Sequence, residues 1–304
     1  MAADSEPDSV GFGLRPAEGG FSGETFVADA AGERTVVRIY TERGARRGPS
    51  APEIDAAVLA LVRGLLPVPK VLEVRRAAAG DRAPGMLVTS HLPGTRLDLL
   101  LPTLDEARRR EVGDRLGALL SRLAQMPMPR RGRFVDGDLR VEPWNADLPE
   151  LVASQRSGTE LEQWPAATFD SLRRVADDAQ GRLDAVDRTC LVHSDFNPKN
   201  LLVDPRTLEV TGLVDWEFAH AGLPVSDLGN LLRFERSPVF VGAVLGAYRA
   251  QVPDAPHDVL EDARAADLCA LVDLAGRRRS NPVAARAHDL LLAIVRTGDL
   301  HAVP

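Results

Sequence analysis

The sequence predicts an α+β protein of two lobes, a small β-sheet lobe with one helix followed by a mostly helical lobe. Roughly the first hundred residues alternate short runs of strand-forming residues with Gly-rich turns. After them, apolar residues recur at helical spacing. The chain has 304 residues, a length that favours about two lobes or domains over one compact core.

Composition and charge restrict the class of partner. Hydrophobic residues make up 44% of the chain and charged residues 27%, which is enough apolar material for a packed interior and argues against disorder. The net charge of -7 disfavours nonspecific binding to nucleic acid or to anionic membranes. We therefore expect a small-molecule partner, while the oligomeric state stays open.

Residue usage also indicates a compartment. Two cysteines, Cys190 and Cys269, form no disulfide framework, so a reducing environment is expected. Residues 1–10 have neither the basic start nor the apolar core of a signal peptide and are typical of a disordered tail. No apolar run approaches the length of about 18 residues that a membrane span needs. We expect a cytoplasmic protein.

Residues 11–92 are predicted to form the sheet lobe. Strand-forming runs and glycine turns predict three strands within residues 11–40. A helix then begins near residue 51, with Ser50 and Glu53 at the spacing of a capping box. Two more strands, in "PKVLEV" and "GMLVTSHL", complete a five-stranded antiparallel sheet.

A connector at 93–98 and a helical lobe at 99–304 are predicted to follow. Residues 126–150 have no regular period, and an insertion of that length is usually functional or mobile. A polar hairpin at 190–203 is expected to pair with the strand in "EVTGLVDWEF". Helices are expected after Thr103, at roughly 168–188, and as three helices within 226–300 that start near Ser226, Pro256 and Pro282.

A cation and an acid accompany a glycine-rich turn in the first lobe. Glycines in "EGGFSGETF" let backbone amides approach an anion closely, although a plain hairpin turn uses glycine too. Strand alternation places Val36, Arg38 and Tyr40 on one face. Asp55 lies on the inward side of its helix, where a lone carboxylate is costly. We therefore expect Arg38 and Asp55 to pair beside the turn; the alternative for Arg38 is an exposed edge position.

A polar loop, "HSDFNPKN", separates two apolar runs in the second lobe. Asp195 and Asn200 are five residues apart in it, and Asp215 ends the next strand. Phosphoryl transfer needs a base for the acceptor proton and oxygen ligands for Mg²⁺, with a cation opposite. Each residue alone fits an ordinary turn or strand end, but the joint order with the glycine turn, strand cation and helix acid indicates phosphoryl transfer.

These motifs resemble those of the aminoglycoside phosphotransferase-like kinases, which include choline kinase-type enzymes. "VHSDFNPKNLLVD" and "GLVDWEFA" resemble the catalytic and metal-binding motifs of the family. "LLPVPKVLE" and "LVTSHLPG" resemble its helix-to-strand turn and its interlobe connector. The resemblance runs from about Gly19 to Asp227. It implies a bilobal, protein-kinase-like fold, with Mg²⁺ as cofactor and ATP or GTP as phosphate donor to a hydroxyl of a small molecule.

The resemblance also implies roles for single residues. Asp195 is the expected catalytic base, Asn200 and Asp215 are the expected Mg²⁺ ligands, and Glu217 is a candidate for a second ion. His193 is expected to be structural, beneath the loop. The nucleotide-binding residues that the resemblance implies are Gly20, Ser22, Val36, Arg38, Asp55, Thr89, Ser90 and His91.

Two positions depart from the commonest family pattern. Arg38 falls where the family often has a Lys, and Asp55 where it often has a Glu. A longer cation paired with a shorter acid spans the same distance between strand and helix. The planar guanidinium of Arg, however, presents several donors, where the ammonium of Lys is a compact charge. Asp227 resembles the buried Asp that braces the catalytic loop, but a helix-start residue after Ser226 explains it equally well.

The acceptor is predicted from acids in the helical lobe, because in this family the insertion and the last helices build the acceptor surface. Asp267 shares an apolar side of its helix, and Asp273 stands in an apolar run, so both are candidates to bind an amine; burial with Arg264 or Arg277 is the alternative. The expected acceptor is cationic and hydroxylated, like an aminoglycoside or a basic peptide antibiotic. A metabolic choline-type or small-alcohol kinase and a nucleotide-binding pseudoenzyme are the alternatives.

Overall fold

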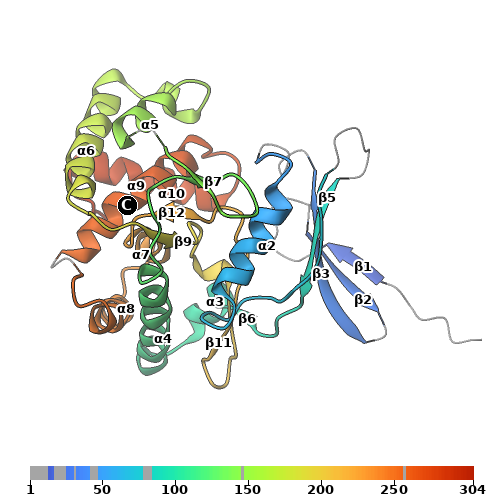
Figure 1. The fold of residues 1–304 in the computed structure, drawn as a ribbon. Helices are drawn as coiled ribbons and strands as arrows, with labels where there is room; N and C mark the ends of the chain where they lie inside the picture. Colours follow the sequence, from blue (N-terminus) through green and yellow to red (C-terminus); the bar gives the residue numbers. More distant parts are fainter. Residues whose placement is uncertain are drawn as a thin grey trace, which may run out of the picture.

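The chain folds into a sheet lobe and a helical lobe that lie side by side (Figure 1). This confirms the predicted α+β, bilobal fold class. Gly20 and Ser22, expected to contact phosphate, lie outside the described residues. The structure, a computed structural model, describes residues 13–16, 25–30, 32–41, 47–77, 84–144, 147–255 and 258–304.

The sheet lobe is a five-stranded antiparallel sheet with strand order β1-β2-β3-β5-β4, as predicted. Strand β3 is central, and its register sets Val36 opposite Thr89 and Arg38 opposite Leu87 of β5. The strands are β1 (Gly13–Pro16), β2 (Thr25–Ala30), β3 (Glu33–Tyr40), β4 (Val71–Arg75) and β5 (Gly85–Ser90).

Helix α2 (Ala51–Val62) packs against this sheet and buries Asp55 on its inner side. The predicted capping box is wrong, because Ser50 makes no side-chain cap. Its hydroxyl instead accepts a hydrogen bond from Arg76 Nη2 at 2.7 Å, and the same guanidinium pairs with Glu53. Arg76 lies beyond β4, so this competitor comes from a distant part of the sequence.

Long helices form the second lobe. Helix α4 packs closely on α8, and a Cβ at Gly117 would collide with the backbone of Val244. Residues 226–300 contain four helices and not the three predicted, because α7 ends after two turns and a separate helix starts at a Ser237 cap. The helices are α3 (Leu97–Leu100), α4 (Glu106–Ala124), α5 (Leu148–Ser154), α6 (Ala166–Asp184), α7 (Ser226–Leu232), α8 (Pro238–Gln251), α9 (Val259–Gly276) and α10 (Pro282–Thr297), with single turns η1 (Leu101–Thr103), η2 (Glu160–Gln163) and η3 (Pro198–Asn200).

Short strands carry the polar loop, but they do not form the predicted hairpin. The strand before the loop, β9 (Cys190–Val192), pairs with β12 (His220–Gly222). The strand after it, β10 (Leu201–Val203), pairs with β11 (Val210–Leu213) and with β6 (Thr95–Arg96) of the connector. The prediction of a hairpin was wrong because each short strand finds a partner elsewhere, so the loop joins two separate sheets.

The insertion after α4 contains one small hairpin, β7 (Arg133–Phe134) and β8 (Val141–Glu142). The backbone of Gly132 exchanges two hydrogen bonds of 3.0 Å with Ala221 of β12. The insertion therefore extends the layer formed by β9 and β12, next to the polar loop.

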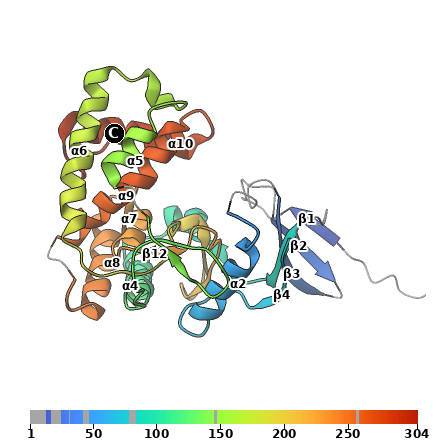
Figure 2. The same ribbon diagram turned by 45° about the horizontal axis from the view of Figure 1, so that its top comes forward.

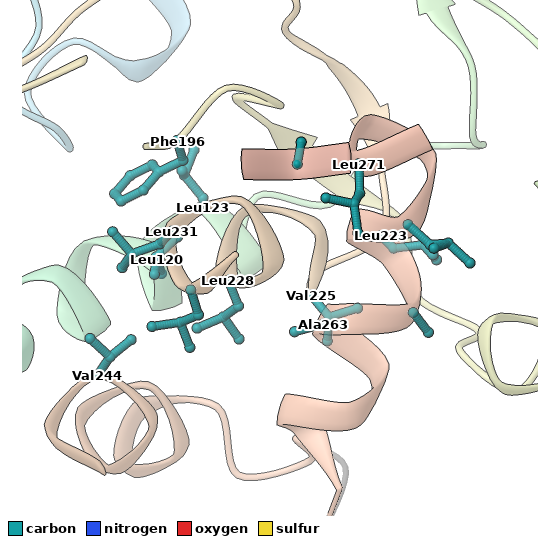
Figure 3. Packing of buried hydrophobic residues seen from close by; sticks show 14 of the residues in the cluster. Leu120, Leu123, Phe196, Leu223, Val225, Leu228, Leu231, Val244, Ala263 and Leu271 are labelled. Carbon is teal, nitrogen blue, oxygen red and sulfur yellow. The ribbon is translucent and has the colours of Figure 1, made fainter. Parts of the chain in front are cut away.

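A hydrophobic core lies directly beneath that loop (Figure 3). Phe196, within the loop, is fully buried together with Leu228 of α7 and close to Leu123 of α4. This packing holds α7 under the loop and so fixes the position of its first turn. Over the residues described, we find no helix with the length and apolar character that crossing a membrane requires.

Candidate active site

Asp227, in the first turn of α7, holds the start of the polar loop. Its buried carboxylate accepts hydrogen bonds of 2.8 Å from the backbone N–H groups of His193 and Ser194. Burial raises the pKa of Asp227, although these N–H groups stabilise the ionised form. The contact is the brace that the resemblance implied, and it fixes the backbone from which Asp195 projects.

His193 lies inside the protein and ties the loop to the segment that bears Asp215. The backbone N–H of Asp195 donates a hydrogen bond to Nδ1 of His193 at 3.2 Å. The proton of the ring therefore resides on Nε2, which donates to the carbonyl oxygen of Val214 at 3.0 Å. The ring packs edge-on against Trp216, with centroids 4.6 Å apart. This is the structural position expected for His193 beneath the loop.

Three side chains of the loop orient the carboxylate of Asp195. Asn200 Nδ2 donates to Asp195 Oδ2 at 2.8 Å and to its carbonyl oxygen at 2.9 Å. Asn197 Nδ2 donates to the other carboxylate oxygen at 2.5 Å, and Lys199 Nζ lies 3.5 Å from Oδ2. Neither Asn197 nor Lys199 was singled out from the sequence. With its side chain 20% exposed, Asp195 is held in place and remains accessible.

Asn200 and Asp215 offer oxygen atoms that suit Mg²⁺, which prefers hard oxygen ligands. Asn200 donates from its NH₂ group to Asp195. Its Oδ1 accepts no hydrogen bond from the described residues, so this oxygen is available to a metal. Asp215 Oδ2 is likewise without a hydrogen-bond donor in the described ranges. The backbone N–H of Val214 donates to the carbonyl of Asn200 at 3.0 Å and keeps both side chains on adjoining segments.

Asp215 also has an unusual backbone conformation, with φ of +66°. Left-handed conformations are uncommon outside glycine, and Asp is one of the residues that tolerates them. No group of three or more His, Cys, Asp or Glu side chains suited to a metal occurs in the described part of the chain. A metal here therefore depends on the Asn200 amide together with Asp215.

Arg38 of β3 reaches from the sheet lobe to the helical lobe. Its Nη1 donates to Asp215 Oδ1 at 2.8 Å, and its Nη2 pairs with Glu217. Burial alone would lower the pKa of Arg38, but the two carboxylates raise it overall. Burial raises the pKa of Glu217, Arg38 opposes the rise, and Asp215 adds to it. The prediction that Arg38 pairs with Asp55 is therefore wrong.

Asp55 is held instead by Arg47 and Tyr40. Both terminal nitrogens of Arg47 donate to its carboxylate, at 2.9 and 2.6 Å, and the Tyr40 hydroxyl donates at 2.6 Å. The Arg38 guanidinium lies 5.6 Å from the centre of the Tyr40 ring. Burial first, and then the Asp55 charge, raises the pKa of Tyr40. The short Asp side chain is thus satisfied by a neighbouring loop and strand, while Arg38 extends beyond it.

The other expected nucleotide residues line the end of β5. Thr89 is buried opposite Val36, and Ser90 Oγ accepts a hydrogen bond from the backbone of Lys70 at 2.9 Å. The His91 N–H donates to the carbonyl of Arg34 at 3.3 Å. Burial, followed by the Arg34 charge, lowers the pKa of His91. These residues lead from the sheet into the connector.

The two acids expected to bind the acceptor already have cationic partners. Buried Asp267 accepts from Arg233 at 2.8 and 2.6 Å and from Asn230 at 2.8 Å, so its carboxylate already has partners within the protein. Burial was the correct alternative, but the partner is Arg233, which lies 34 residues away. Asp273 pairs with Arg277 one helical turn on, the partner that the alternative named, but the pair is half-exposed and not buried. Neither acid offers an unpaired charge to an amine.

The chain is similar in sequence to proteins of known families. The model of a family described as phosphotransferase enzymes matches residues 13–261. Mouse acyl-CoA dehydrogenase family member 10 is 26% identical over 192 residues, which cover 59% of this chain and 16% of that protein. Rat acyl-CoA dehydrogenase family member 11 is 39% identical over 51 residues, or 17% of this chain and 6% of that protein. The chain thus matches only a small part of the length of these curated relatives.

Solved structures share the fold over nearly the whole chain. Aminoglycoside 2'-phosphotransferase-IIIa in complex with GDP has a TM-score of 0.67 and 15% identity, covering 96% of this chain and 94% of that one. A ternary complex of aminoglycoside phosphotransferase APH(4)-Ia with ADP and hygromycin B has a TM-score of 0.64 and 17% identity, covering 95% and 94%. Choline kinase LicA from Streptococcus pneumoniae has a TM-score of 0.64 and 16% identity, covering 94% and 93%.

Proposed function

From the premise that the chain belongs to the phosphotransferase enzyme family, we propose that it transfers the γ-phosphate of ATP or GTP to a small hydroxylated molecule in the presence of Mg²⁺. Family membership makes it a phosphotransferase that acts on hydroxyl groups; the donor, the metal and the acceptor are our proposal. One observation carries it: the accessible Asp195 carboxylate is bonded to Asn200 on a loop braced by Asp227. A cytoplasmic location, expected from the sequence, belongs to the same proposal.

Asp195 is proposed as the group that receives the acceptor proton. The acceptor oxygen forms the new bond to the γ-phosphorus while the bond to the bridging oxygen of the nucleoside diphosphate breaks. The hydroxyl proton passes to the Asp195 carboxylate, whose orientation is set by Asn197 and Asn200. Such a general base contributes about 10²- to 10⁴-fold in rate.

Asn200 Oδ1 and Asp215 are the proposed ligands of Mg²⁺, and Glu217 is a candidate for a second ion. When bound, Mg²⁺ offsets the negative charge of the phosphates. Arg38 is the proposed phosphate-binding cation. It belongs to residues 11–92, which we propose as the nucleotide-binding lobe. The partly exposed position of Asp215, with 36% of its side chain accessible, is compatible with sharing it between a metal and Arg38.

Two classes of acceptor molecule remain once Asp267 and Asp273 are seen to pair with arginines. An aminoglycoside-like acceptor was expected from Asp267 and Asp273, and their pairing with arginines weakens that argument. A metabolic small alcohol of the choline type gains weight accordingly. The similar solved structures include both a hygromycin B complex and a choline kinase, so they support a small acceptor without choosing between the two.

The test is nucleotide turnover by the purified chain. Release of ADP or GDP is measured with Mg²⁺ against aminoglycosides, choline and small alcohols, and Asp195→Ala serves as the inactive control. We expect acceptor-dependent release that the variant loses, while the affinity for Mg-nucleotide stays nearly intact. A chain that binds nucleotide but phosphorylates none of these acceptors would favour the pseudoenzyme alternative. A variant that keeps more than half the activity would remove Asp195 from its role.

A further inference from the structure

Two large aromatic side chains are exposed near the polar loop. Phe218 is 55% exposed and Trp144 is 52% exposed, whereas Trp164 and Trp216 are 8% and 4% exposed. An aromatic ring in water leaves a large apolar area unburied, and such rings are favoured where a ligand covers them. The mechanism proposed above uses neither side chain.

Phe218 belongs to the segment that carries the metal ligands. It directly follows Glu217, which pairs with Arg38. The neighbouring Trp216 packs on His193 beneath the loop, and its indole N–H donates to the carbonyl of Leu213 at 3.0 Å. Because Trp216 is turned inward and fixed, Phe218 is presented from a rigid segment near Asp215.

Trp144 reaches the same region from the insertion. Its ring lies on His220, with centroids 4.4 Å apart. His220 pairs in β12 with Val192, the last residue of β9 before the polar loop. His220 in turn contacts the carbonyl of Phe218 through Nδ1 at 2.9 Å. One imidazole therefore connects the two exposed aromatic residues.

The insertion also borders the space between the lobes. A Cβ at Gly137 would lie 3.2 Å from Cβ of Glu53 in α2, so the tip of the insertion touches the sheet lobe. Figure 2 shows the insertion and β12 on the side of the helical lobe that faces α2. The insertion that carries Trp144 thus contacts both β12, through Gly132, and α2, through Gly137.

Charge is nearly balanced along this aromatic surface. Arg133 pairs with Glu142, and Arg140 pairs with Asp136 at 3.0 Å. Burial lowers the pKa of His220 to about 4, so its imidazole is uncharged near pH 7. A ligand that contacts Trp144 and Phe218 meets apolar rings and a neutral imidazole, which suits an uncharged planar group better than a polycation.

We propose that Trp144 and Phe218 bind a planar apolar part of the acceptor, such as an aromatic ring, and that His220 positions Trp144. The inference rests on the proposed phosphotransfer, because it names the acceptor class of the same site: a hydroxylated molecule with a flat apolar face. Stacking of this kind changes affinity by about fivefold to tenfold for each ring. Trp144 and Phe218 are thus specificity-determining, and the hydroxyl is presented to Asp195 by this contact.

Trp144 supplies its own probe for binding. The chain contains three tryptophans, of which the other two are buried, so an aqueous quencher such as acrylamide reports chiefly on Trp144. Phenyl β-D-glucoside and methyl β-D-glucoside offer the same sugar hydroxyls and differ in the planar ring. With Mg-ADP present, we expect the phenyl glucoside to protect Trp144 from quenching at concentrations where the methyl glucoside does not. Trp144→Phe should abolish the response.

Equal protection by both glucosides, or by neither, would overturn the proposal. Protection by choline alone would also overturn it, in favour of a cation held against the rings. The assay reads binding and not turnover. Protection without phosphate transfer to any tested acceptor would count against the proposed function, while the binding of a planar group by Trp144 would stand.

Kinetics provide a second test once an acceptor has been found by turnover. Trp144→Ala and Phe218→Ala should each raise the acceptor KM about fivefold to tenfold while the nucleotide KM stays unchanged. Trp144→Phe should restore most of the loss, because it keeps a planar ring. Val283→Ala, which trims a side chain that is 46% exposed on α10, is the matched control. An unchanged acceptor KM in both alanine variants would refute the proposal while phosphate transfer itself stood.

Discussion

Arg38 on the central strand of the sheet lobe donates to Asp215 of the helical lobe, with 2.8 Å between Nη1 and Oδ1. The pair joins the two lobes at the candidate active site. The carboxylate of Asp215 therefore binds the Arg38 guanidinium and is also the proposed ligand of the metal. Since Arg is a planar fork, it engages Glu217 with its second terminal nitrogen, which a lysine point charge does not reproduce.

The first prediction concerns this pair. Arg38→Ala should raise the nucleotide KM by roughly 10- to 100-fold, because a hydrogen bond to a charged group contributes about 1.5–3 kcal/mol. Arg38→Lys should recover part of the loss by keeping the charge. Without the guanidinium, Mn²⁺ should bind more tightly in the absence of nucleotide, since Asp215 is then available to it.

Steady-state kinetics and Mn²⁺ titration followed by electron paramagnetic resonance measure these effects. Arg75→Ala removes a charge from an exposed position of β4 in the same sheet and should change neither value. If Arg38→Ala left both the nucleotide KM and the Mn²⁺ affinity at their original values, Arg38 would have no part in the site.

The second prediction tests which arginine, Arg47 or Arg38, is the partner of Asp55. Arg47→Met and Asp55→Asn should each destabilise the protein by as much as about 3–5 kcal/mol, because each leaves a buried charge or polar group without its partner. The double variant should lose clearly less than the sum. Arg38 and Asp55 should couple more weakly, since they share no hydrogen bond among the described residues and interact through their charges and through Tyr40.

Urea unfolding of the single and double variants tests this coupling. Losses that add fully for Arg47 and Asp55 would show that the bidentate pair does not form in solution. Tyr40→Phe keeps the ring beneath Arg38 and removes only the hydroxyl bond, so it should cost about 0.5–1.5 kcal/mol.

Local sequence patterns were enough to predict much of the site. Strand alternation placed Arg38 and Tyr40 on one face, and the spacing of Asp195 and Asn200 brought an acid and an amide into contact. What failed was partner choice over long separations. Arg38 had a candidate acid 17 residues away in Asp55, but its partners are 177 and 179 residues away.

The reason is physical. A helix or strand period tells which side chains point inward, because it depends on neighbouring residues only. It contains no information on which inward side chain from another element is nearest. Asp267 shows this clearly: its inward position was predicted, whereas Arg233, at the end of a different helix, could be identified only from the packed structure. Arg47, only eight residues before Asp55, was missed for a different reason: it lies in a loop, where no period indicates which way a side chain points.

The third prediction concerns Asp227. Asp227→Asn offers one acceptor oxygen where the carboxylate offers two, so the backbone N–H of His193 or Ser194 loses its partner. A buried unsatisfied donor costs about 1–3 kcal/mol, and loosening of the loop should lower kcat by at least about tenfold. Thermal unfolding and kinetics at saturating substrate measure the two effects. An unchanged kcat in a folded variant would mean that Asp227 does not hold the loop.

The last prediction is a dependence of stability on pH that arises from His220. Burial lowers the pKa of this imidazole from 6.5 to about 4. The unfolded chain therefore takes up the proton more readily than the folded protein. The contribution to stability is complete above pH 6.5 and is lost as the pH falls from 6.5 towards 4, by no more than about 3 kcal/mol.

His220→Phe removes the titrating group and keeps a ring against Trp144, so it isolates this effect. The urea midpoint of the unmodified protein should fall more steeply between pH 6.5 and 4 than that of the variant, as followed by circular dichroism. Because protonation places a charge between Trp144 and Phe218, acceptor protection of Trp144 fluorescence should weaken over the same interval. Parallel pH curves for the two proteins would show that His220 is not buried as a neutral imidazole.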